Sequence, residues 1–194
     1  MIHAERLRVF HQADLYVVIT EALCAGRSAV EILDMTLAAG VRLVQLREKD
    51  LSGRALFELA GEFRGRTGDA GALLIINDRL DIALAAGADG VHLGQDDLPV
   101  SAARSLGSEL IIGASTHSLE EALAAQDAGA SYVNIGPIFA TLTKEGATPL
   151  GPEMIDRIAP KLRLPWTTMG GIKKTNIDQV VSRGAKHPAV ITAV

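Results

Sequence analysis

Cysteine is almost absent from this chain of 194 residues. The single cysteine, Cys24, cannot form an internal disulfide and has no partner at metal-ligand spacing. Long hydrophobic runs are missing as well, because the longest, such as 72–76, fall far short of the roughly 18 residues that span a bilayer. Charged residues interrupt every apolar run near the N-terminus. The sequence therefore predicts no transmembrane helix and no secretion signal, and we expect the protein to be cytoplasmic.

An excess of basic charge is also lacking. The net charge is −4, and the 23 acidic residues are spread along the chain rather than gathered in a tail. This balance excludes nucleic-acid binding as the main role. The composition, 48% hydrophobic and 22% charged, is typical of a globular chain with one sizeable core. Because no linker or low-complexity segment divides it, we expect residues 1–194 to form one domain.

Strand-like and helix-like segments alternate along the whole chain. Glycines at four places follow a helical pattern and precede a β-branched run, as expected where a helix ends and a strand begins: Gly40, Gly87, Gly129 and Gly184. Strands are expected at 15–19, 42–46, 72–76, 90–93, 110–114, 132–135, 166–169 and 189–193. Helices are expected near 28–39, 53–67, 79–86, 99–106, 118–128, 151–159 and 173–183, several of them opened by a residue of capping type (Ser28, Ser52, Ser101 and Ser118).

Eight strands alternating with seven helices predict a closed (β/α)₈ barrel, the TIM barrel of the α/β class. An open doubly wound sheet is the alternative. The sequence ends with the last expected strand, where a full barrel would carry an eighth helix. We expect either a truncated sequence or another surface over the gap, such as a second copy of the chain in a homo-oligomer.

Polar side chains gather where several of the expected strands end, which is where such barrels carry their active sites. Side chains point alternately to the two faces of a strand. Along 42–46 and the residues just after it, this alternation places Gln45, Arg47 and Lys49 on one face. Two cations and an amide suit an anionic group such as a phosphate or diphosphate. A solvated cluster of charges is the alternative.

Carboxylates follow the next two expected strands. Asn77 and Asp78 end the run at 72–76, and Asp96 and Asp97 follow the strand at 90–93. Mg²⁺ usually takes one or two protein carboxylates and completes its shell with phosphate oxygens and water. Asp78 and one of Asp96 and Asp97 could therefore hold a metal over a diphosphate. Helix capping is the alternative for each, and Asp97 is placed to cap a helix that begins at Pro99.

Two further loops carry features of a second anion site. The segment 136–151 is too long for a simple connection, and it holds Thr141, Thr143 and Lys144. Gly170 and Gly171 precede an expected helix, where exposed backbone N–H groups favour an anion; a plain turn is the alternative. Two anion sites predict that a phosphorylated substrate and a diphosphate substrate meet between them.

Five ordered motifs, extending over almost the whole chain, resemble those of the thiamine-phosphate synthase family: 45–50, 76–79, 91–99, 136–144 and 169–172. The resemblance implies a transferase that joins hydroxymethylpyrimidine diphosphate to hydroxyethylthiazole phosphate, with magnesium as cofactor, and releases diphosphate. It also implies a dissociative route, in which diphosphate leaves before the thiazole nitrogen attacks. Charge on the leaving group must then be stabilised, whereas no strong protein base is needed.

The resemblance assigns roles residue by residue. It implies that the pyrimidine diphosphate is held by Gln45, Arg47, Lys49 and Asn77, that Asp78 and Asp97 bind magnesium, and that Ser115 contacts the pyrimidine. Lys144 would meet the diphosphate, so that Arg47, Lys49 and Lys144 act as the catalytic cations. Thr141 and Thr143, with Gly171, Ile191 and Thr192, would hold the thiazole phosphate. Thr192 stands where serine is common in the family.

Two other functions remain open for the same barrel. A sister family, the thiazole tautomerases, uses a histidine near the position of His117 for proton transfer. The presence of Asp97, Thr141, Thr143 and Lys144 together argues against it, since an isomerase expels no diphosphate. A non-catalytic sensor of phosphate ligands is the third interpretation.

Overall fold

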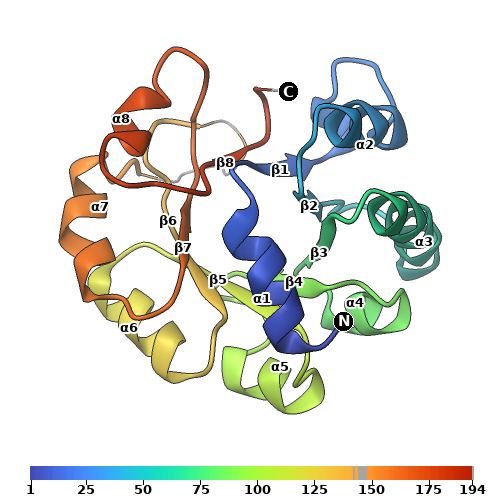
Figure 1. Ribbon diagram of the computed structural model, residues 1–194, viewed down its shortest axis with the longest axis horizontal. Coiled ribbons are helices and arrows are strands. Elements are labelled where there is room, and N and C mark those ends of the chain that lie inside the picture. The colour runs from blue at the N-terminus through green and yellow to red at the C-terminus, as the bar shows by residue number, and fades with distance from the viewer. Residues whose placement is uncertain (142, 144–147, 194) are drawn as a thin grey trace.

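Eight parallel strands form one sheet that curves into a nearly closed barrel in this computed structural model, which describes residues 1–141, 143 and 148–193 (Figure 1). The order is β7-β6-β5-β4-β3-β2-β1-β8, and a parallel bridge between Thr168 and Pro188 joins the two ends of the sheet. The strands are β1 (Tyr16–Ile19), β2 (Leu43–Leu46), β3 (Leu73–Asn77), β4 (Gly90–Leu93), β5 (Ile111–Thr116), β6 (Tyr132–Ile135), β7 (Trp166–Thr168) and β8 (Ala189–Val190). The expected (β/α)₈ barrel is confirmed, and the open doubly wound sheet was the wrong alternative.

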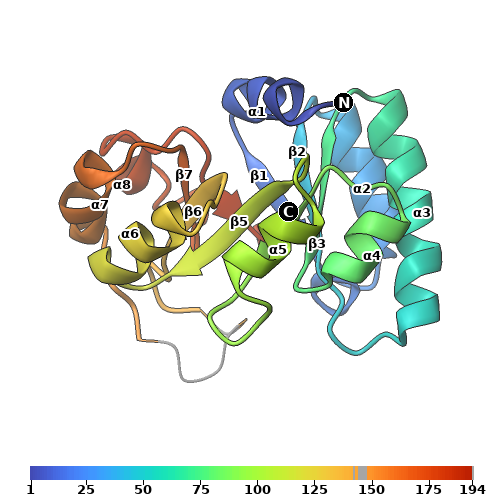
Figure 2. The ribbon, with the colours of Figure 1, turned by 90° about the horizontal axis from the view of Figure 1, so that it is seen from below.

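The helices that connect the strands cover the outside of the barrel (Figures 1 and 2). Alternation along each strand explains this packing: Val44 and Leu46 of β2 face the helices, whereas Leu43 faces the interior. The connecting helices are α2 (Ala29–Ala38), α3 (Gly53–Asp69), α4 (Leu80–Ala85), α5 (Val100–Leu106), α6 (Leu119–Asp127), α7 (Glu153–Ile158) and α8 (Asp178–Val181), with short 3-10 turns η1 (Glu21–Leu23) and η2 (Ala159–Lys161).

Three of the four expected helix caps are present. The side chains of Ser28, Ser52 and Ser118 each accept a hydrogen bond from the backbone of the first helical turn. Ser101 was wrong, because it lies inside α5, whose N-cap residue is Pro99. The last two connecting helices are also shorter than expected, and α8 begins only at Asp178.

An eighth α-helix, which the sequence analysis missed, precedes the first strand. Helix α1 (His3–Gln12) lies across the amino-terminal end of the barrel (Figures 1 and 2). Its Phe10 is fully buried, with its ring centroid 4.8 Å from that of Tyr132. Arg6 of α1 and Arg64 of α3 both pair with Asp89, which precedes β4. Within the described residues no helix follows β8.

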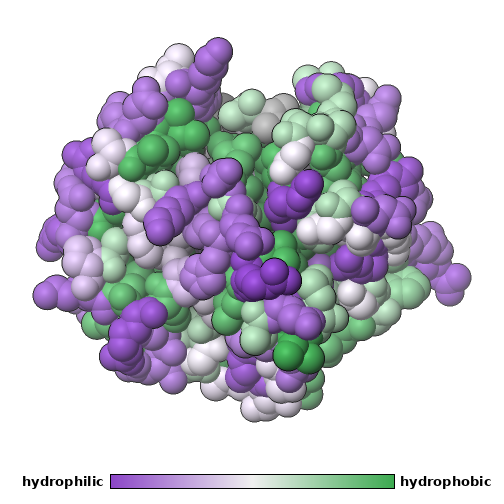
Figure 3. All heavy atoms as spheres, in the orientation of Figure 1, coloured by the Kyte–Doolittle hydropathy of each residue, from purple (hydrophilic) through white to green (hydrophobic). Residues whose placement is uncertain are grey.

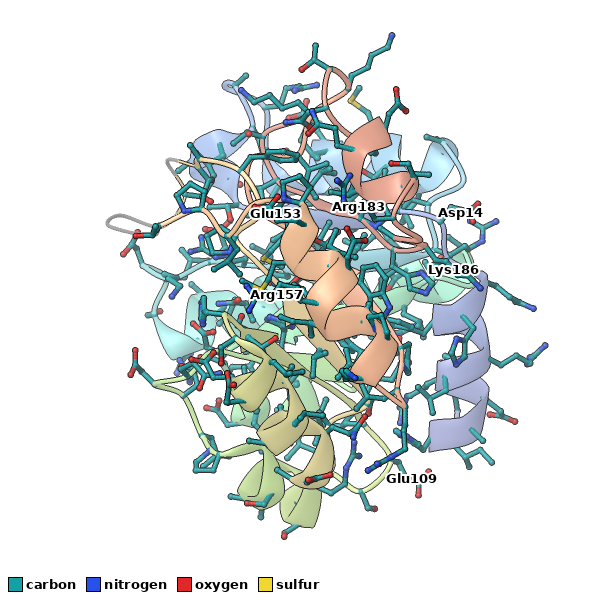
Figure 4. All side chains as sticks on the ribbon, turned by 90° about the vertical axis from the view of Figure 1, so that its left-hand side faces the viewer. Asp14, Glu109, Glu153, Arg157, Arg183 and Lys186 are labelled. Carbon is teal, nitrogen blue, oxygen red and sulfur yellow. The ribbon has the colours of Figure 1, made fainter. Side chains whose placement is uncertain are left out.

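The face that α1 covers is mixed in character. Figure 3, which looks onto this end, shows hydrophilic side chains interspersed with apolar areas. On the side of α7 and α8, Glu153, Arg157 and Arg183 lie along the same face (Figure 4), and Arg183 binds Asp156 of α7 at 3.1 Å. In the described part of the chain, no helix combines the length and apolar character needed to cross a membrane.

Candidate active site

Two adjoining pockets lie at the carboxyl ends of the strands. The first, called here the diphosphate pocket, has a volume of about 840 Å³ and is lined by residues that follow β2, β3 and β4. The second, called here the loop pocket, has a volume of about 590 Å³ and is lined by residues that follow β5 to β8. Four residues line both of them: Ser115, Thr143, Met169 and Ile191. Two ligands bound in these pockets would therefore meet.

The end of β2 supplies the cations of the diphosphate pocket. Gln45 points into the barrel and is buried, as alternation predicts, while Arg47 and Lys49 continue the same face into the pocket. Lys49 Nζ lies 3.3 Å from Asp78 Oδ2. Among the described residues Arg47 forms no salt bridge; it lines the pocket, and its charge interacts electrostatically with the neighbouring Glu48 carboxyl.

The two candidate metal ligands, Asp78 and Asp97, lie next to each other in this pocket. Asp78 has a left-handed backbone, with φ of 61°, and its N–H donates to the carbonyl of His92 at 2.8 Å. Burial and the neighbouring Asp97 carboxyl raise the pKa of Asp78, and the Lys49 ammonium opposes this shift. Asp97 Oδ2 accepts from the N–H of Gly94 at 2.6 Å. Asp97 therefore forms a hydrogen bond within the loop that follows β4 and does not cap α5. The helix-cap alternative was wrong for this residue.

A pair of neighbouring carboxyls beside the Lys49 ammonium fits Mg²⁺. No group of three or more His, Cys, Asp or Glu side chains at metal-binding distance occurs among the described residues. Two carboxylates are nonetheless enough when a diphosphate and water supply the other ligands. A divalent ion would also offset the Asp97 repulsion that, together with the larger effect of burial, raises the pKa of Asp78. Asp96 lines the same pocket, but Asp97 is the residue that interacts with Asp78.

Buried polar residues that the sequence analysis did not assign to the site lie beneath this pocket. Tyr16 of β1, Tyr132 of β6 and His92 of β4 point into the barrel and are joined by hydrogen bonds. Burial lowers the pKa of His92 to about 4 and raises the pKa of both tyrosines, so all three are neutral near pH 7. Alternation within the predicted strands could have shown that these side chains point inward. It could not have identified their hydrogen-bond partners, because those lie on distant strands.

The loop pocket is built by two loops that pack closely. The N–H groups of Ile138 and Phe139 donate to the carbonyls of Met169 and Gly170, both at 2.9 Å. Gly170 and Gly171 have positive φ, and a Cβ at either would overlap the segment 137–140. The glycines thus let the loop after β6 reach the loop after β7. No helix begins directly after them, because α8 starts at Asp178, and the expected helix N-terminus was wrong.

Hydroxyl groups and one histidine complete the loop pocket. Thr141 Oγ1 and Thr143 Oγ1 are 2.8 Å apart, and Thr192 also lines this pocket. His117 follows β5, and its Nδ1 lies 2.9 Å from Glu121 Oε2. This ring is therefore held at the pocket edge by a carboxylate.

The structure brings the sequence-predicted residues into the two pockets. Gln45, Arg47, Lys49, Asn77, Asp78 and Asp97 line the diphosphate pocket, Thr141, Gly171 and Thr192 line the loop pocket, and Ser115, Thr143 and Ile191 line both. Lys144 lies outside the described residues. The roles assigned to these residues stay predictions.

Comparison with known proteins agrees with this architecture. The family model of thiamine monophosphate synthase matches residues 15–194. A thiamine-phosphate synthase of Pelotomaculum thermopropionicum is 41% identical over 196 residues, which covers 100% of this chain and 90% of the relative. One of Chlorobium luteolum is 52% identical over 169 residues, covering 86% and 80%. The solved thiamine phosphate pyrophosphorylase of Pyrococcus furiosus superimposes with a TM-score of 0.88 at 37% identity, covering 95% of this chain and 88% of that one.

Barrel, pockets and relatives together define the class: this is a (β/α)₈-barrel enzyme, and it is a transferase. More particularly, the chain belongs to the thiamine-phosphate synthase family, a family of thiamine biosynthesis.

Proposed function

We propose that this protein joins hydroxymethylpyrimidine diphosphate to hydroxyethylthiazole phosphate and releases diphosphate, forming thiamine phosphate. The observation that carries the proposal is the pair of adjoining pockets, one lined by cations and carboxylates and the other by hydroxyls and glycines, with Ser115, Thr143, Met169 and Ile191 between them. Such a site holds two reactants at once, and alignment of two bound reactants removes much of the entropic barrier to their reaction.

The diphosphate pocket stabilises the leaving group. Arg47 and Lys49, with the amide of Asn77, line the space in which the diphosphate would sit. In the proposed dissociative route the bond to the diphosphate breaks first, so negative charge grows on the leaving oxygens. Fixed cations that already face those oxygens lower the barrier without reorganising during the reaction. Lys144, on the resemblance, adds a third cation.

Asp78 and Asp97 are the residues that would hold Mg²⁺. When bound, the ion neutralises charge on the diphosphate and favours its departure. Lys49 lies 3.3 Å from Asp78 and so bridges the carboxylate side of the pocket to the phosphate side. The Gly94 N–H holds the carboxylate of Asp97 in place.

The remaining residues orient the two rings. Ser115 and Gln45 face the proposed pyrimidine position, while Thr141, Thr143 and Gly171, with Ile191 and Thr192, surround the proposed thiazole phosphate. The attacking thiazole nitrogen carries a lone pair and needs no base. His117 therefore has no proton to transfer in this reaction.

One observation favours a second function, thiazole tautomerisation. His117 lines the loop pocket and is hydrogen-bonded to Glu121, an arrangement suited to proton transfer. The diphosphate pocket argues for the synthase, because an isomerase would have no use for Arg47, Lys49, Asp78 and Asp97 around a second anion site. The same set argues against a sensor without catalysis.

A direct assay tests the proposal. The purified protein is incubated with both substrates and magnesium, and thiamine phosphate and diphosphate are measured by mass spectrometry and phosphorus NMR. We expect both products in equal amounts, no product when either substrate is omitted, and a strong loss with EDTA. Interconversion of thiazole isomers without thiamine phosphate would instead establish the tautomerase.

A further inference from the structure

A chain of hydrogen bonds runs through the barrel interior beneath the diphosphate pocket. It starts at Gln45, whose Nε2 lies 2.6 Å from Tyr16 Oη, and Tyr16 Oη lies 3.0 Å from Tyr132 Oη. Tyr132 Oη lies 2.8 Å from His92 Nδ1, and His92 Nε2 lies 2.9 Å from Ser115 Oγ. Both tyrosines are fully buried, whereas Gln45 and Ser115 line the pocket. Two parts of the pocket floor are thus connected through the protein.

The direction of donation along this chain follows from its first bond. An amide nitrogen can only donate, so Tyr16 accepts from Gln45. The hydrogen of Tyr16 is then donated to Tyr132, and the hydrogen of Tyr132 is donated to His92 Nδ1. The ring hydrogen of neutral His92 must therefore sit on Nε2, from where it is donated to Ser115 Oγ.

This direction fixes what the pocket floor offers to a ligand. Ser115 accepts from His92, and its own hydroxyl hydrogen has no acceptor among the described residues. Gln45 uses its nitrogen on Tyr16, so its carbonyl oxygen is left as an acceptor. The floor thus presents one donor and one acceptor. An aromatic ring with a nitrogen acceptor and an amino donor matches this pattern, as an aminopyrimidine does.

We propose that Tyr16, Tyr132 and His92 are positioning residues, which hold the Ser115 hydroxyl as a donor and the Gln45 carbonyl as an acceptor for an aminopyrimidine ring. This inference rests on the proposed function, which supplies the pyrimidine. The strands leave room for this chain of hydrogen bonds. A Cβ at Gly113 of β5 would overlap the ring of Tyr132, so glycine there lets that ring reach across the barrel.

Nitrogen-15 NMR of the ligand-free protein tests the direction of the chain. We expect His92, assigned with the variant His92→Asn, to be the Nε2–H tautomer. Tyr132→Phe removes the donor to Nδ1 and should shift that nitrogen signal. An Nδ1–H tautomer in the unmodified protein would reverse every donor and overturn the proposal. This measurement needs no catalysis. It therefore still tests the direction of donation along the hydrogen-bond chain if the protein makes no thiamine phosphate and the proposed function fails.

Steady-state kinetics test the positioning role. In Tyr16→Phe we expect the KM for the pyrimidine diphosphate to rise about tenfold, as for a weakened hydrogen-bonded contact, with the KM for the thiazole phosphate within about twofold of normal. Thr168→Val is the matched control. It removes a buried hydroxyl that donates to Ile135 O at 2.9 Å and that does not belong to the chain of hydrogen bonds. Both KM values should be unchanged in this control. Equal changes in both KM values of Tyr16→Phe, or lower thermal stability alone, would show a structural role and refute the proposal.

Discussion

At the scale of single residues, a strained backbone conformation occurs at the candidate metal site. Among the described residues only Ala25 and Asp78 combine a side chain with a positive φ. Such a conformation costs of order 1 kcal/mol or more, and the surrounding structure must hold it. For Asp78 the bond from its N–H to His92 O does so, and it turns the carboxyl toward Asp97. We interpret this strain as the cost of bringing two carboxylates together.

The variant Asp97→Asn tests the metal role without disturbing the loop. Asparagine keeps an oxygen that can accept the Gly94 N–H, which Asp97 accepts at 2.6 Å, but it removes the negative charge. We expect synthase activity to fall by about 100-fold or more, as for loss of a major electrostatic contribution, with the melting temperature nearly unchanged. Activity is measured against magnesium concentration. Undiminished activity that is also insensitive to EDTA would contradict the metal role of Asp97.

The pair Lys144→Ala and His117→Ala separates the two enzymatic functions. In a synthase the Lys144 ammonium interacts more strongly as charge grows on the diphosphate, so its loss should slow the chemical step about 100- to 1000-fold. His117, held by Glu121 at the edge of the loop pocket, should matter only modestly. Both variants are compared at saturating substrates. A collapse of activity in His117→Ala alone would mean that proton transfer is the chemistry of this site.

Site residues differed in how well the sequence could reveal them. Gln45, Arg47 and Lys49 could be placed on one face because alternation is strict within and just beyond a strand. Tyr16 and Tyr132 could not be paired, because their 3.0 Å contact joins strands 116 positions apart. Periodicity predicts the direction in which a side chain points but not its hydrogen-bond partner across the barrel.

At the scale of elements, local patterns predicted the strands well and the last helices poorly. Strands β4 and β6 have the expected bounds, because glycine or a turn residue marks both ends. Strand β8 is shorter than the expected 189–193, since it pairs with β1 only over Ala189 and Val190, and Ile191 and Thr192 turn into the pockets. Helix α1 was missed because Phe10 is its only fully buried residue and polar or charged residues occupy most of its other positions.

Glycines in different elements should respond oppositely to alanine. Gly113→Ala places a Cβ on the ring of Tyr132, so we expect a loss of about 1–3 kcal/mol in the free energy of unfolding from overpacking. Gly65→Ala lies in the exposed interior of α3 with nothing within 4 Å of the new Cβ, and should gain roughly 0.5–1 kcal/mol. Urea unfolding of both variants measures these values. Equal effects of the two substitutions would contradict the close packing assigned to β5.

At the scale of the whole molecule, the two ends of the barrel have different roles. The carboxyl ends of the strands carry the pockets, whereas α1 and the segment before β8 close the other end. His187 joins these two parts of the chain: its Nδ1 lies 2.6 Å from the carbonyl of Ala13, and its ring packs 4.9 Å from that of Phe10. The closed end therefore contains buried aromatic and imidazole rings.

This closed end makes stability depend on pH. Burial lowers the pKa of His187 below its ordinary value of 6.5, helped by nearby His11 and Lys186 and opposed by the Ala13 carbonyl and Asp14. The folded state thus disfavours the protonated ring, and the unfolded chain binds the proton more readily. The stability that neutral His187 contributes is fully present above about pH 6.5 and is lost as the pH falls from there toward the lowered pKa.

The variant His187→Asn should reduce this dependence. Asparagine is neutral at every relevant pH and offers an N–H to the Ala13 carbonyl, which lies 2.6 Å from the His187 ring nitrogen. We expect the free energy of unfolding, measured in urea at several values between pH 7 and 5, to fall less steeply in the variant than in the unmodified protein. Buried His92 titrates in both proteins, so the difference between the two slopes isolates His187. Identical slopes would mean that His187 is protonated as easily in the folded barrel as in the unfolded chain, and that burial beneath α1 does not set its pKa.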